Sequence, residues 1–105
     1  MDLVTKYIMD HSDGCKKPVR GSQIAAAFGV SGIEVRRIIN TARGHGDLIC
    51  SNTRGYYIAQ DKAAVQRTID NLNGRIAAMS RAVNGLEATL MRADFGKGGE
   101  AGEVA

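Results

Sequence analysis

A ten-residue segment, "SGIEVRRIIN" at residues 31–40, carries the side chains best suited to a chemical task. An arginine guanidinium can bond the O6 and N7 atoms of guanine together, and an asparagine amide can bond adenine in the same two-point manner. An isoleucine offers an apolar contact for the methyl group of thymine. The segment therefore predicts reading of base edges in the major groove of DNA, by Ile33, Arg36, Arg37 and Asn40.

The distribution of charge favours a polyanionic partner over the simpler alternative, a solvated helix face. The chain of 105 residues has a net charge of +3, but seven basic residues against two acidic ones fall between residues 16 and 54. Residues 55–105 carry six of each. Positive charge that is concentrated in one folded segment is typical of nucleic-acid-binding proteins.

Contacts to phosphates would hold a base-reading helix in register on the duplex. Basic residues lie on both sides of the segment, and the free N–H groups at the start of the preceding helix are a favourable place for a phosphate. The side chain at position 54 lies in a predicted turn and can reach a minor groove or the backbone. These supporting contacts are expected from Lys16, Lys17, Arg20, Ser22, Gln23, Arg43 and Arg54.

The elements that must position these residues follow from hydrophobic spacing and helix boundary signals. A first helix is predicted over about residues 3–11, with Asp2 as its N-cap. A second helix, "GSQIAAAF", ends at Gly29, which permits the positive φ of a tight turn. Residues 31–34 read S-x-x-E, a capping box that starts a third helix ending near residue 43. The buried stripe of this third helix is predicted to be Val35, Ile38, Ile39 and Ala42.

Two β-prone runs follow the third helix. "DLICS" and "GYYIA" predict a hairpin whose turn is residues 52–55. Residues 18–20 are long enough only for a bridge or a short edge strand.

This order of elements resembles a winged helix-turn-helix domain, over about residues 1–60. The residues that carry the resemblance are "IAAAFGVSGIEVRRIINTARGHGDLI" followed by "GYYIA". They are similar to the core and the recognition helix of bacterial and phage regulators, including those of the biotin-repressor type. The resemblance implies a mainly α fold with a small β-wing, and binding to DNA.

A long helix is predicted over residues 61–93, followed by a disordered, glycine-rich tail over residues 94–105. Its apolar residues recur at alternating intervals of three and four, which is a heptad repeat. β-Branched residues dominate the a positions and favour a parallel two-stranded coil, although an antiparallel pair and a four-helix arrangement stay open. Folding back onto the same domain is disfavoured, because about 30 residues of helix span about 45 Å, longer than so small a domain can cover. The residues expected to form the homodimer are Ile69, Leu72, Ile76, Met79, Val83, Leu86 and Leu90.

Other classes of function find little support. The two cysteines and two histidines match no common zinc spacing, and no Walker-type or G-x-S-x-G motif occurs. We expect no enzyme activity, no metal or other cofactor, and no small-molecule ligand. We also expect no membrane span and no signal peptide, and hence a cytoplasmic protein.

The features combine into one functional expectation. The chain is predicted to bind double-stranded DNA sequence-specifically as a homodimer, as a phage or bacterial regulator of transcription or replication. The alternative is a small phage-type inhibitor that uses the winged-helix scaffold to bind a host protein.

Overall fold

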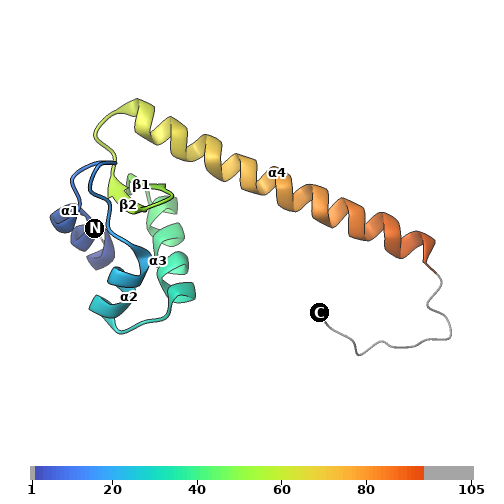
Figure 1. The fold of residues 1–105 in the computed structure, drawn as a ribbon, viewed down its shortest axis with the longest axis horizontal. Helices are drawn as coiled ribbons and strands as arrows, with labels where there is room; N and C mark the ends of the chain where they lie inside the picture. The colour runs from blue at the N-terminus through green and yellow to red at the C-terminus, as the bar shows by residue number, and fades with distance from the viewer. Residues whose placement is uncertain (1, 94–105) are drawn as a thin grey trace. The chain divides into compact units, whose positions relative to one another are not determined.

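The computed structural model describes residues 2–93, and the predicted tail at residues 94–105 lies outside them. Within this range the chain is mainly helical with one small antiparallel sheet, as predicted (Figure 1). The elements in order are α1 (Leu3–His11), α2 (Gly21–Phe28), α3 (Gly32–Gly44), β1 (Ile49–Asn52), β2 (Gly55–Ile58) and α4 (Lys62–Arg92).

The helices begin and end at the residues that the boundary signals indicate. The carboxylate of Asp2 accepts a hydrogen bond from the Val4 amide at 2.8 Å, which satisfies a free N–H group at the start of α1. Gly29 adopts φ 66° and ψ 36° after α2, and the amides of Gly29 and Val30 both donate to the carbonyl of Ala25. The turn between α2 and α3 is therefore closed by main-chain hydrogen bonds.

The first turn of α3 realises only half of the predicted capping box. Ser31 Oγ accepts from the Glu34 amide at 3.1 Å, but the Glu34 carboxylate bonds Arg37 instead of returning to the amide of Ser31. The serine alone is sufficient to cap the helix.

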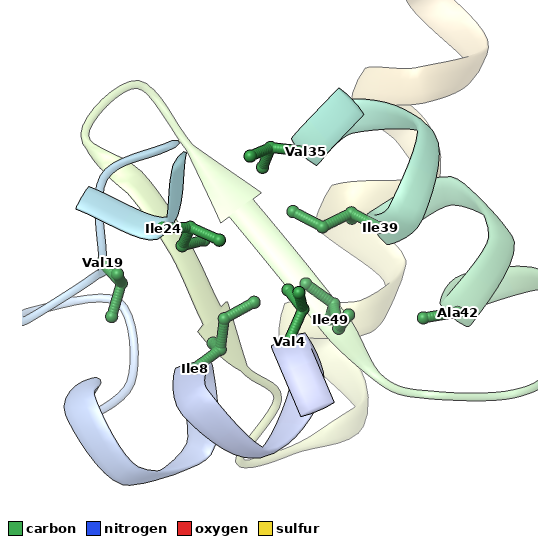
Figure 2. Close-up of a cluster of buried hydrophobic side chains, with 8 residues drawn as sticks. All are labelled: Val4, Ile8, Val19, Ile24, Val35, Ile39, Ala42 and Ile49. Carbon is green, nitrogen blue, oxygen red and sulfur yellow. The ribbon is translucent and has the colours of Figure 1, made fainter. Parts of the chain in front are cut away.

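An aliphatic core joins α1, α2, α3 and β1 (Figure 2). Ile8 and Ile24 have no exposed surface, and Ile39 retains only 1%. Aromatic side chains close the edge of this core, where the rings of Tyr7 and Phe28 meet edge to face at 5.6 Å between centroids. The buried side chains are Val4, Ile8, Val19, Ile24, Val35, Ile39, Ala42 and Ile49.

The hairpin uses its two faces differently. Ile49 and its partner Ile58 lie against the aliphatic core, whereas the next pair, Cys50 and Tyr57, packs on a second cluster with Ala64 at the start of α4. This alternation follows from the two-residue period of a strand. The first turns of α4 thus belong to the first compact unit, which runs to residue 70; the second unit begins at residue 71.

Residues 18–20 contribute a bridge, as predicted. The amide and carbonyl of Val19 exchange two hydrogen bonds of 2.7 Å with those of Tyr56. This close approach explains Gly55, which has φ 150°, because a Cβ at Gly55 would overlap the carbonyl group of Val19.

None of the helices within residues 2–93 combines the length and the apolar character needed to span a membrane.

The Gly55→Ala substitution is expected to lower the free energy of unfolding of the first unit by about 1–3 kcal/mol, because alanine is strained at this φ. All three tyrosines of the chain, at positions 7, 56 and 57, lie in this unit, so tyrosine fluorescence during denaturant unfolding reports its stability. Gly44→Ala is the matched control, since Gly44 has no heavy atom within 4 Å of the added carbon and no positive φ. Equal stabilities for the two variants would contradict the role assigned to Gly55.

Candidate nucleic-acid interface

α3 presents two stripes of side chains on opposite faces. Val35, Ile39 and Ala42 are each at most 2% exposed, and Ile38 packs half-buried beside them. The predicted base-reading residues have the same i, i+3, i+4, i+7 spacing but start two residues earlier, which places them about 200° around the helix axis. All four of them, Ile33, Arg36, Arg37 and Asn40, are exposed, as the sequence pattern requires of a reading face.

Arg37 has a carboxylate partner within its own helix. Its Nε donates to Glu34 Oε1 at 3.1 Å, and a terminal nitrogen bonds Glu34 Oε2. The hydrogen bonds that Arg37 donates to the Glu34 carboxylate lower the pKa of Glu34 and raise the pKa of Arg37. Both side chains remain well exposed, at 66% for Arg37 and 37% for Glu34. A solvent-screened pair of this kind orients the guanidinium but is weak enough to exchange partners.

Arg36 makes no side-chain hydrogen bond or ion pair with any residue in the described range 2–93. The two acidic residues of the basic middle segment are both engaged elsewhere, Glu34 with Arg37 and Asp47 with the hydroxyl of Thr5. Lys16, Lys17 and Arg20 are likewise exposed and have no carboxylate partner among the described residues. The positive charge of this segment is therefore left largely uncompensated by the fold.

Arg43 has a structural role that the sequence did not indicate. Its Nε donates to the carbonyl of Ile49 at 2.8 Å, and its terminal nitrogens reach Ser51 Oγ at 3.3 Å and Asn40 Oδ1 at 3.5 Å. The side chain thereby ties the end of α3 to β1 and orients the Asn40 amide. Arg43 was predicted as a phosphate contact, and its donors are already used in positioning the hairpin against α3.

The turn of the hairpin is fastened to the loop that precedes α2. Arg54 donates to the carbonyl of Lys16, and Asn52 Nδ2 donates to the carbonyl of Cys15 at 3.2 Å. Two of the predicted phosphate contacts, Lys16 and Arg54, are thus brought together although they are 38 residues apart in sequence.

The start of α2 has no side-chain cap. Arg20 occupies the N-cap position without a capping hydrogen bond from its side chain, while Ser22 and Gln23 are exposed in the first turn. Gln23 Nε2 lies 3.4 Å from Tyr7 Oη. No hydrogen bond or ion pair within residues 2–93 joins Lys17, Arg20 or Ser22 to the exposed face of α3.

One buried polar contact near α3 was missed at the sequence level. Thr5, which is 2% exposed, donates from Oγ1 to Asp47 Oδ2 at 2.7 Å and so joins α1 to the loop before β1. Its position beside Val4 and one turn before Ile8 places it on the inward face, which was the only sequence signal for its burial.

Comparison with models of protein families, with curated proteins and with solved structures gives no match to this chain.

Arg37→Ala is expected to raise the pKa of the Glu34 carboxyl toward its ordinary value, because the hydrogen bonds that favour the charged form are lost. Because the pKa of Glu34 is lower in the folded chain, the pair stabilises the fold at pH values above the pKa of Glu34 in the unfolded chain. This stabilisation is lost as the pH falls through the pKa of Glu34 in the folded chain. A carbon-13 NMR titration of the glutamate side chains measures the shift. The matched control is Arg36→Ala, which removes the same charge from a neighbouring guanidinium that does not bond Glu34; similar shifts in both variants would refute the assigned pair.

Proposed function

We propose that residues 1–70 form a winged helix-turn-helix domain that binds double-stranded DNA with α3 in the major groove. The observation that carries the proposal is the exposed stripe of α3, which bears two guanidinium groups and an amide opposite an apolar stripe packed into the core. The major groove is wide enough for one α-helix, and its base edges present acceptors and donors that these groups match.

The exposed stripe suggests distinct contacts along the groove. Arg36, which has no partner among the described residues, is the first candidate for bidentate contact with guanine. Arg37 reaches a base or a phosphate by exchanging its bonds to Glu34, whereas Asn40 reads adenine while Arg43 orients its amide. Ile33, at 76% exposed, supplies the contact for a thymine methyl.

Phosphate contacts come from the surroundings of α2 and from the hairpin, which takes the place of the wing. Lys16 and Arg54 meet at the hairpin turn, and Arg20 lies at the uncapped start of α2. An uncapped helix N-terminus with exposed first-turn residues suits a phosphate oxygen. Arg43 acts in this scheme mainly by holding the hairpin against α3.

The biological role proposed is regulation of transcription or replication by a cytoplasmic phage or bacterial protein. A homodimer would bring two copies of α3 to one duplex, and a two-fold arrangement favours an inverted-repeat site.

The alternative function is binding to a host protein through the same scaffold. The observation that favours it is the exposed Ile33, since aliphatic side chains also suit the centre of a protein interface. An inhibitor of this kind would retain its partner after loss of the arginines and would show no affinity for duplex DNA.

Replacing Arg36, Arg37 and Asn40 by alanine is expected to cost about 1–3 kcal/mol of binding free energy for each base contact removed. Fluorescence anisotropy with a duplex selected from a random-sequence pool measures this loss. The control variant replaces Arg67 and Arg81, two exposed arginines of α4, and removes the same charge. Equal losses in the two variants would show that α3 does not read sequence, and unaltered binding in the triple variant would remove α3 from the interface.

Binding is expected to weaken steeply with salt, because about three to five phosphates are neutralised per subunit and each contributes about −0.9 to the slope of log K against log salt. Lys16→Ala and Arg20→Ala should each reduce the magnitude of that slope by about 1 while weakening binding to all sequences alike. Anisotropy titrations at several salt concentrations give the slope. Affinity that does not respond to ionic strength would exclude this phosphate-contact model.

A further inference from the structure

An apolar stripe of α4 remains uncovered in the single chain. Its residues recur at alternating intervals of three and four, and the exposed fractions of Ile76, Met79, Leu86 and Leu90 lie between 60% and 72%. Such a row of apolar side chains is unfavourable in water and calls for a covering surface. The stripe consists of Ile69, Leu72, Ile76, Met79, Val83, Leu86 and Leu90.

The shape of the stripe indicates that another helix covers it. The apolar residues repeat about every 3.5 residues, whereas a straight α-helix has about 3.6 residues per turn. A narrow row with this period therefore stays in contact with a partner only when that partner is another helix and the two wind around each other. A membrane surface or a globular core would require a wider apolar face. Here the flanking positions are polar or small at Asn73, Ser80, Ala82 and Thr89, all of them exposed.

We propose that the covering surface is a second copy of this chain, in a parallel, in-register, two-stranded coil that begins at Ile69 and extends to Leu90. Parallel pairing sets each stripe residue against the same residue of the partner. The a positions are then Ile69, Ile76, Val83 and Leu90, and the d positions are leucine and methionine. β-Branched side chains at a with unbranched or γ-branched ones at d suit a parallel dimer.

The N-terminal limit of the coil is set by the hairpin. Val65 continues the repeat, but it packs half-buried against the cluster of Cys50, Tyr57 and Ala64. Thr68, one residue before the stripe, is 5% exposed, and its Oγ1 accepts from the Ser51 amide at 3.4 Å. The first turns of α4 are therefore already used within the chain, and Ile69 is the first residue of the repeat that is open to a partner.

This limit also selects the direction of the partner helix. An antiparallel pair brings a positions opposite d positions, which matches Ile69 with Leu86, Leu72 with Val83 and Ile76 with Met79. Leu90 then falls opposite Val65, which its own hairpin covers. An antiparallel pair displaced by one heptad matches Leu90 with Leu72 but leaves Ile69 unpaired. Parallel pairing alone covers all seven residues of the stripe.

The coil has a consequence for the proposed DNA binding, and this part rests on that proposal. Parallel helices start at the same end, so both first units are joined to one end of the coil. Two copies of α3 then belong to one dimer, and the DNA site is predicted to be an inverted repeat.

The first experiment measures mass in solution without DNA, by sedimentation equilibrium of the full chain. The wild-type protein is expected at twice the chain mass of 11.2 kDa. Ile76→Asp with Val83→Asp should give monomers, because the charges would be buried in the coil. The control, Ala77→Asp with Asn84→Asp, changes the adjacent exposed residues outside the stripe and should remain dimeric. A monomeric wild type, a mass of four chains, or dimers that persist in the stripe variant would each overturn the proposal.

The second experiment tests direction by disulfide crosslinking in a glutathione buffer. Leu90→Cys is made together with Cys15→Ser, since Cys15 is the exposed native cysteine and Cys50 is buried. A parallel coil places the two new thiols side by side, and a covalent dimer is expected. Either antiparallel pair separates them by at least about 18 residues of helix, about 27 Å or more, and leaves them reduced. The control is Asn84→Cys made together with Cys15→Ser; position 84 lies outside the stripe, so this variant should not crosslink. If the Leu90→Cys variant is a dimer in solution but forms no disulfide, the parallel arrangement is wrong. Both experiments omit DNA, so their failure is distinct from failure of the proposed function.

Discussion

Burial of one stripe of α3 is the constraint on which the rest of the first unit depends. Val35, Ile39 and Ala42 are almost without solvent exposure, and they face side chains from α1, α2 and the hairpin (Figure 2). A helix that is fixed on one side by close packing has no freedom to rotate about its axis. The orientation of Arg36 and Asn40 toward solvent is thus a consequence of the core, and a single local interaction does not determine it.

The hairpin transmits this constraint to the remaining elements. Val19 holds β2 by two short main-chain hydrogen bonds, Gly55 allows their approach, and Arg43 fastens β1 to the end of α3. Because successive strand residues point to opposite faces, the same hairpin closes the core on one side and receives Ala64 of α4 on the other. A two-stranded sheet of this size is only marginally stable alone, and its packing against helices on both faces provides the additional stability.

The electrostatic character of the first unit follows from where its few carboxylates are engaged. Asp47 is held by the buried hydroxyl of Thr5, and Glu34 is paired with Arg37 in solvent. The exposed cationic side chains at positions 16, 17, 20 and 36 have no carboxylate partner among the described residues. An anionic ligand would gain from these unpaired cations without having to break structural contacts, which is the physical basis of the proposed DNA interface.

The sequence by itself determined the helices, the hairpin and the direction in which α3 faces, because helix caps, Gly29 and the two periodicities are local signals. It placed Ile33, Arg36, Arg37 and Asn40 together on one exposed face, which the structure confirms. Only the tertiary structure decided which cations are already bonded and which residues at the start of α4 pack against the hairpin. Arg43 meets Ile49, and Thr68 meets Ser51, through contacts that depend on how the hairpin lies against its neighbours. Hydrophobic spacing fixes which side of an element is buried, but it contains no information about which polar atoms come within hydrogen-bonding distance across two elements.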